Sequence, residues 1–313
     1  MPPNEVIAFN EGIGGDTTND TDVQRLSSII DRHGDASVSL VQSGTNDANA
    51  LRTANAFEGD MQSLVSRLFA EGMDVHVATL PPILNAGSGL SSTRNQRIDQ
   101  YNDRIRNNIT GALSGADIWA FFAPDDTGDS VADRIRTFLF ADDLHPNGLG
   151  HAIIAQLWYN VLVGDSTGTA VVPFIADFLS RSNYKLNLLE DGDEYLVDSA
   201  AQLTSVPASL QSAIWIMTAQ ADSGNSSSDF LSFDLDRNAT VYVAYDADAG
   251  GLPNWLNPAT SAFTEVPGVQ LTTTQTSYRI FSRPVSAGSV MLGGNNAAGA
   301  AGASDMYLVG LLP

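Results

Sequence analysis

The first half of the chain alternates between two hydrophobic patterns. Short apolar runs bounded by glycine, proline or asparagine are typical of buried strands, and they occupy residues 6–9, 37–42, 74–80 and 118–122. Between them, apolar positions recur roughly every three to four residues, which predicts helices. The expected helices cover residues 22–32, 46–72, 95–113, 131–140 and 151–162. Strands that alternate with helices predict a mostly parallel sheet covered on both faces, that is, a three-layer α/β/α domain.

The second half of the chain has a different pattern. From about Tyr195 the helical period disappears, and short runs rich in β-branched and aromatic residues alternate with turn clusters. This spacing predicts an all-β sandwich. Its expected strands cover residues 213–218, 230–235, 239–245, 277–282, 289–292 and 306–311. We therefore expect an α/β domain over 1–163, a linker with one short helix over 164–183, and a β-sandwich over 184–313.

Composition and charge exclude several classes of protein. The 313 residues include 36 acidic and 15 basic side chains, for a net charge of −21, and no cysteine. An acidic chain repels phosphate backbones, so we expect no nucleic-acid partner. Without cysteine there is no disulfide framework and no thiolate nucleophile. No apolar run approaches the ~20 residues of a membrane span. The acidity favours an extracellular protein, with an ordinary secreted surface and adaptation to salt as the two explanations.

One polar segment has a spacing that suits acid–base chemistry. Asp142 and His145 lie three residues apart, just before an expected helix, and Pro146 and Asn147 follow. At this spacing a carboxylate can accept a hydrogen bond from one imidazole nitrogen and leave the other to act as a base. The structural alternative is a helix start with a surface histidine.

Two further segments place hydrogen-bond donors after apolar strands. Asn46 follows the run at 37–42, and its amide can donate to a developing oxyanion. Gly15 lies in a glycine-rich turn after the run at 6–9, where a backbone N–H can point at a bound anion. Helix capping by asparagine and an ordinary tight turn are the structural alternatives.

Together these segments resemble the motif blocks of the SGNH (GDSL-type) hydrolase family of esterases and lipases, over about residues 6–163. The resemblance implies His145 as the base, Asp142 as the residue that orients it, and Gly15 with Asn46 as the oxyanion donors. It implies hydrolysis of small-molecule or glycan esters that carry short acyl groups, such as acetyl groups on polysaccharides. No metal or other cofactor is expected.

The chain departs from the family at the nucleophile. The family's Gly-Asp-Ser block precedes its glycine block, but only 14 residues precede Gly15 here and none is serine. We expect that the first strand and the nucleophile have been truncated away. Ser166 in a permuted chain and Ser130 in an improvised site are weaker candidates. A sheet that lacks an interior strand is expected to rearrange or to be covered in a homo-oligomer.

The missing serine leaves a second function open. A nucleophilic hydroxyl is needed to form an acyl-enzyme, and the expected β-sandwich resembles accessory domains of secreted carbohydrate-active enzymes. The alternative to an ester hydrolase is therefore a non-catalytic carbohydrate-binding or adhesion protein derived from such an enzyme.

Overall fold

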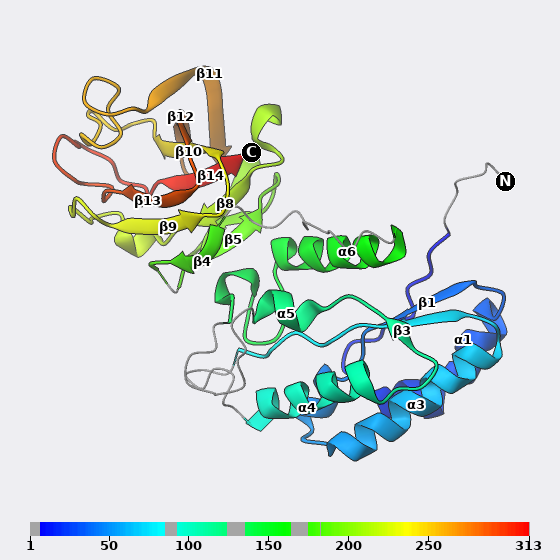
Figure 1. Cartoon of the computed structure of the whole chain (residues 1–313). Helices are drawn as coiled ribbons and strands as arrows, with labels where there is room; N and C mark the ends of the chain where they lie inside the picture. The colour runs from blue at the N-terminus through cyan, green and yellow to red at the C-terminus, as the bar shows by residue number, and fades with distance from the viewer. Residues whose placement is uncertain (1–6, 85–92, 124–134, 164–174, 182, 313) are drawn as a thin grey trace. The chain divides into compact units, whose positions relative to one another are not determined.

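The chain divides into two compact units. The computed structural model describes residues 7–84, 93–123, 135–163, 175–181 and 183–312 (Figure 1). Unit 1 comprises Met1–Ile135 and Leu157–Gly168, and unit 2 comprises Arg136–Gln156 and Thr169–Pro313. The domain limits expected at residues 163 and 184 stay a prediction. The loop that carries Asp142 and His145 nevertheless belongs to the same unit as the antiparallel strands.

Unit 1 contains a parallel sheet of three strands. The strands β1 (Val38–Val41), β2 (Asp74–Val77) and β3 (Leu113–Ser114) pair in that order, and two of them confirm the strands expected at 37–42 and 74–80. The described residues form no regular five-stranded sheet. In this part of the chain β1 is an edge strand, and its Val38 and Leu40 are 42% and 45% exposed, although strands of parallel sheets are normally covered on both faces.

Helices follow or precede each strand of this sheet, as the pattern predicts. In Figure 1, α1, α3 and α4 lie on one side of β1–β3. The described helical elements are η1 (Asp20–Arg25), α1 (Leu26–His33), α2 (Thr45–Asn49), α3 (Ala54–Ala70), α4 (Thr93–Asn107), α5 (Ile118–Phe122), η3 (Thr137–Leu139) and α6 (Gly148–Val163). They confirm helices within 22–32, 46–72, 95–113 and 151–162.

Three expectations for the first half are wrong or fall short. Ile118–Phe122 forms α5 instead of a strand, because the Asp117 side chain accepts a hydrogen bond from Ala120 N at 3.2 Å and caps the helix. A short apolar run does not by itself distinguish a strand from a helix. Residues 7–9 form no strand, and in the described part of 131–140 the only helical turn is η3.

The segment after β2 is held to α4 by two buried asparagines. Asn102 accepts a hydrogen bond from Leu80 N at 2.7 Å and donates to Leu80 O at 3.1 Å. Asn95 makes the same pair of bonds with Ile83, at 2.7 and 2.8 Å. Side-chain amides thereby satisfy backbone groups that no strand pairs with, which buried backbone requires.

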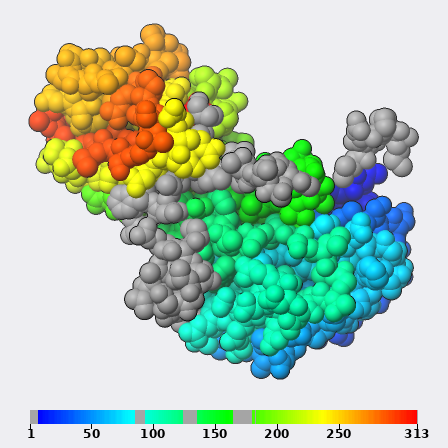
Figure 2. Space-filling view, in the orientation of Figure 1, coloured from blue at the N-terminus to red at the C-terminus, as the bar shows by residue number. Residues whose placement is uncertain are grey.

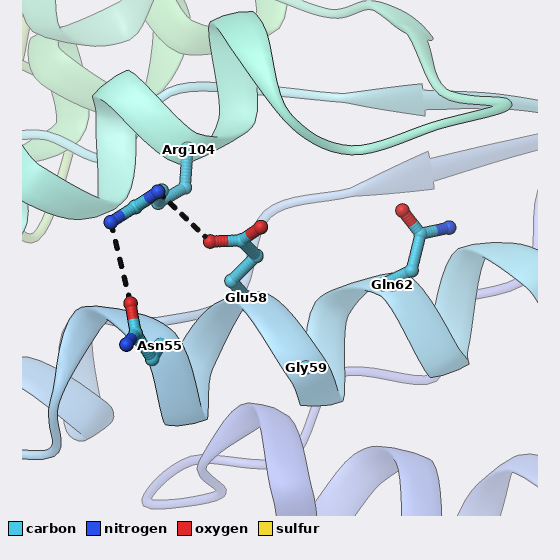
Figure 3. A pocket seen from close by; sticks show the side chains of 5 residues that line it. All are labelled: Asn55, Glu58, Gly59, Gln62 and Arg104. Carbon is cyan, nitrogen blue, oxygen red and sulfur yellow. Dashed lines mark hydrogen bonds and ion pairs between the residues drawn. The ribbon is translucent and has the colours of Figure 1, made fainter.

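The surface formed by α3, blue in Figure 2, and α4, turquoise, carries a groove. Its lining residues are Asn55, Glu58, Gly59, Gln62 and Arg104 (Figure 3). Arg104 reaches Glu58 at 3.2 Å and Asn55 at 3.3 Å, so its charge is already neutralised within the groove. No site residue expected from the sequence lies there.

Unit 2 is built on two antiparallel sheets, which confirms an all-β region. One has eight strands in the order β5-β8-β14-β10-β12-β11-β7-β6, and the other has the order β13-β9-β4. The strands are β4 (Ile175–Leu179), β5 (Lys185–Leu188), β6 (Glu194–Leu196), β7 (Ser199–Ser205), β8 (Ile214–Met217), β9 (Leu231–Leu235), β10 (Ala239–Asp246), β11 (Thr264–Thr273), β12 (Ser277–Val285), β13 (Gly288–Leu292) and β14 (Leu308–Leu312).

All six strands expected beyond residue 195 form, but the described part of the linker contains no helix. Residues 175–179 are strand β4 instead, paired antiparallel with β9 at Ile175↔Leu235 and Leu179↔Phe233. Backbone pairing with a distant strand outweighs a weak local preference for helix. The remaining residues of the expected linker up to 174 lie outside the described part of the chain.

Gly44 tests how tightly the loop after β1 is packed. Its φ is +136°, and an added Cβ would lie 2.7 Å from Leu80 Cδ1 and 2.7 Å from Phe57 Cε2. We expect Gly44→Ala to lower the free energy of unfolding by about 2–4 kcal/mol, because left-handed strain adds to overpacking. Gly72→Ala, at φ +87° with open space around it, should cost about 1 kcal/mol. Urea unfolding followed by helical circular dichroism measures both, and equal losses would contradict this packing.

Candidate active site

Asp142 and His145 form a closely bonded pair in the loop between η3 and α6. One carboxylate oxygen, Oδ1, accepts the backbone N–H groups of Leu144 and His145, each at 2.7 Å. The other, Oδ2, lies 2.9 Å from His145 Nδ1. With Nδ1 as the donor, Nε2 carries the free lone pair and is available as a base. The geometry is therefore that of an imidazole held in one tautomer by a carboxylate.

The electrostatics of the pair suit this role. The hydrogen bond from the His145 side chain, followed by the backbone N–H groups of His145 and Leu144, lowers the pKa of Asp142 to about 2. Asp142 is therefore a carboxylate throughout the neutral range, as the partner of an imidazolium must be. The side chains of His145 and Asp142 are 68% and 58% exposed, so a substrate can reach them.

The loop that carries the pair is closed at its base. The N–H of Ala141 donates to His145 O at 2.8 Å, and the N–H of Asn147 donates to Leu139 O at 2.8 Å. Gly150 packs so closely on this loop that an added Cβ would lie 2.5 Å from Leu139 O. These backbone contacts fix the position of the main chain at Asp142 and His145.

Asn147 is a residue of this site whose role the sequence did not reveal. Its buried side chain donates to Phe138 O at 2.9 Å and to Leu186 O at 2.6 Å, and accepts from Gly150 N at 2.9 Å. It joins the loop, the start of α6 and strand β5. Its place directly after His145-Pro146 was the available signal, but the distant partner was not visible.

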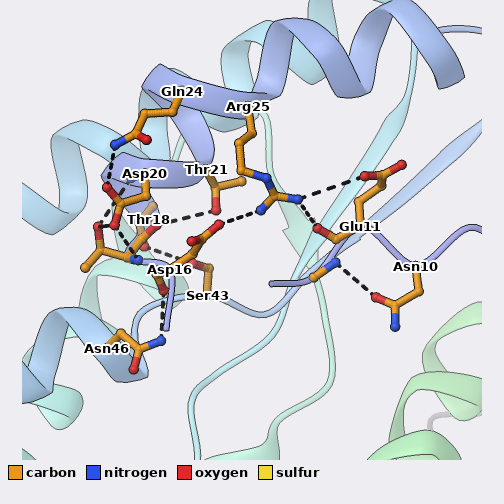
Figure 4. Close-up of polar contacts among 12 residues, drawn as sticks. Asn10, Glu11, Asp16, Thr18, Asp20, Thr21, Gln24, Arg25, Ser43 and Asn46 are labelled. Carbon is orange, nitrogen blue, oxygen red and sulfur yellow. Dashed lines mark hydrogen bonds and ion pairs between the residues drawn. The ribbon is translucent and has the colours of Figure 1, made fainter. Parts of the chain in front are cut away.

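The second pair of expected residues, Gly15 and Asn46, lies in unit 1. Asn46 Nδ2 donates to Asp16 O at 2.9 Å (Figure 4), so its amide lies against the residue that follows Gly15. Gly15 has a φ of +91° and open space where a Cβ would be. In the part of the chain that the structure describes, this contact uses one N–H of the Asn46 amide, which leaves its second N–H as a donor.

A buried polar network supports this second pair. Asp47 is fully buried and accepts the N–H of Thr18 at 2.8 Å and a charged hydrogen bond from Arg52 at 2.8 Å. Burial raises the pKa of the Asp47 carboxyl, while Thr18 and Arg52 oppose that rise. Thr18 Oγ1 also lies 3.2 Å from Ser43 Oγ. The network joins the glycine-rich turn to the loop after β1.

The four expected site residues thus fall into two pairs, one in each unit. Asp142 and His145 are brought together in unit 2, and the segments of Gly15 and Asn46 in unit 1. Ser130 and Ser166, the candidate nucleophiles, lie outside the described residues. Within the described ranges, no three histidine or acidic side chains gather as a metal site would require. Over the same ranges, no helix combines the length and apolar character that crossing a membrane needs.

Residues 2–158 match the family model of GDSL-like lipase/acylhydrolase. No curated protein matches the chain.

Solved structures also resemble part of the chain. A GDSL-like lipase from Bacteroides thetaiotaomicron is 15% identical, with 49% of this chain and 73% of that chain covered and a TM-score of 0.40. A carbohydrate esterase family 3 protein from Talaromyces cellulolyticus is 18% identical, with 52% of this chain and 76% of that chain covered and a TM-score of 0.39. A β-glucuronidase from glycoside hydrolase family 2 is 23% identical at a TM-score of 0.37, and the match covers 41% of this chain and 13% of that chain.

The charge state of Asp142 tests the geometry of the pair. Because its pKa is lowered, its contacts are in place above the ordinary value of about 3.8 and are lost as pH falls through about 2. The His145→Ala substitution removes the side-chain hydrogen bond that lowers this pKa most, so the titration midpoint of Asp142 should rise towards 3.8. Carboxyl carbon NMR of ¹³C-aspartate-labelled protein measures it. His151→Ala, an exposed histidine on α6, should leave the midpoint near 2. An Asp142 midpoint near 3.8 in the parent protein would refute the pair.

Proposed function

The chain belongs to the GDSL-like lipase/acylhydrolase family, and we propose that it hydrolyses carboxylic esters that carry short acyl groups, including acetyl groups on polysaccharides. The observation that carries the proposal is the Asp142–His145 pair, in which Nδ1 is bonded to the carboxylate and Nε2 has no bonded partner among the described residues. The antiparallel sheets that follow the family region support a polysaccharide as the alcohol component. The extracellular location and a homo-oligomer stay predictions from the sequence.

In the proposed mechanism His145 moves the protons. A hydroxyl attacks the acyl carbon, and His145 Nε2 takes the proton of that hydroxyl while Asp142 stabilises the imidazolium. The oxyanion donors expected from the sequence are the backbone N–H of Gly15 and the amide of Asn46. His145 then returns the proton to the leaving alcohol. If the attacking hydroxyl belongs to a serine, water hydrolyses the acyl-enzyme by the same steps.

The attacking hydroxyl is the group that a labelling experiment identifies. Ser130 and Ser166 are the candidates from the sequence. Ser43 also carries a hydroxyl and lies in the same loop as Asn46, where its Oγ contacts Thr18 Oγ1. Treatment with a fluorophosphonate and mass spectrometry of the peptides would show which serine is labelled.

Hydrolysis of p-nitrophenyl acetate and butyrate tests the proposal. His145→Ala should lower kcat by about 10²–10⁴, because a positioned base is lost. Asn46→Ala should lower it by about 10²–10³, because one oxyanion donor is lost. Two controls, His151→Ala and Asn107→Ala on the exposed face of α4, should keep the parent rate. A parent rate no higher than that of His145→Ala would sink the hydrolase and leave the non-catalytic glycan-binding alternative.

A further inference from the structure

Strand β5 bonds to the loop of Asp142 and His145 along its free edge. Among the described strands, β5 is the first in the order of the eight-stranded sheet and pairs only with β8. An edge strand presents unpaired backbone groups. Here the carbonyl of Leu186 accepts a hydrogen bond from Asn147 Nδ2 at 2.6 Å. The loop, which belongs to the same compact unit, therefore completes the edge of the sheet.

Asn187 holds the start of α6. Its Oδ1 accepts the N–H of Leu149 at 3.2 Å, so it satisfies a helix donor that has no partner within the helix. Gly148 approaches so closely that an added Cβ would lie 2.7 Å from Asn187 Oδ1. The close approach of Asn187 to the start of α6 therefore requires a glycine at residue 148.

Lys185 holds the other end of the loop. It is the chain's single lysine, is half-buried, and donates from Nζ to Thr137 O at 3.2 Å. Burial lowers its pKa, and the nearby carboxylates of Asp143 and Asp142 oppose that effect. The ammonium of Lys185 therefore lies within electrostatic range of both carboxylates of the loop that carries His145.

Three consecutive residues of β5 thus anchor three different points. Lys185 binds residue 137 before the loop, Leu186 binds residue 147 after it, and Asn187 binds residue 149 at the start of α6. Lys185 and Asn187 project from the same face of the strand, because side chains alternate along it. In the described part of the chain, the His145 ring bonds only to Asp142, so its orientation depends on how the loop is held.

We propose that β5 supports the hydrolase site by holding the loop of His145, and that Lys185 and Asn187 are positioning residues for His145. The antiparallel sheet then serves the reaction directly and is more than a separate binding module. This inference rests on the proposed ester hydrolysis. A small displacement of a catalytic group lowers the rate of the chemical step more than it lowers substrate binding.

The test measures kcat and KM for p-nitrophenyl acetate with the full chain. Lys185→Met and Asn187→Ala should each lower kcat by about tenfold or more, in the range seen for outer supporting residues, with KM changed less than twofold. Lys185→Arg should recover most of the rate, because it keeps both the charge and a donor. Arg237→Met, which removes an exposed cation of the same unit paired with Asp236, is the matched control and should keep the parent rate.

A double variant separates positioning from a general loss of folding. Gly148→Ala should lower kcat through its clash with Asn187, and Asn187→Ala should make that same substitution nearly neutral. This coupling stays measurable even where single variants are less stable. A parent kcat in Lys185→Met and Asn187→Ala, with His145→Ala inactive, would overturn only this inference. A parent no faster than His145→Ala would overturn the proposed function and this inference together.

Discussion

The proposed chemistry depends on the hydrogen bonds that the Asp142 carboxylate accepts. Three hydrogen bonds from its own turn, two from the backbone and one from His145, hold the carboxylate ionised and the imidazole in one tautomer. The pair is exposed, and exposed ion pairs contribute little to stability by themselves. It therefore needs a scaffold, and the contacts of Asn147 and β5 provide one within the same compact unit.

The remaining part of the proposed chemistry has its own scaffold in unit 1. Asn46 lies against the backbone beside Gly15, and the buried Asp47 network fastens the glycine-rich turn to the loop after β1. Buried polar groups of this kind are satisfied by several partners at once, which makes the turn rigid. Membership of the GDSL-like lipase/acylhydrolase family supports an ester hydrolase. In the proposed mechanism, the first pair supplies the base and the second pair the oxyanion donors.

Local signals in the sequence predicted the features that depend on local spacing. The Asp142–His145 contact spans three residues, and the strands beyond residue 195 follow from alternation and turn residues. Features that depend on distant partners were not predictable in this way. Asn147 and Leu186 are 39 residues apart, and β4 forms only because β9 pairs with it. The prediction of a strand at Ile118–Phe122 is wrong because an apolar run of this length suits both a strand and a helix. The N-cap at Asp117 favours the helix.

Chemical rescue tests the central claim, that His145 is the base of an ester hydrolase, most directly. Imidazole is added to the His145→Ala variant, and the hydrolysis of p-nitrophenyl butyrate is compared with the rate in buffer that contains the same imidazole. We predict a saturable increase above that background, because free imidazole takes the place of the missing ring, and no such increase in Asn46→Ala. A His145→Ala variant that matches the parent without imidazole, or that imidazole does not restore, would contradict the assignment of His145.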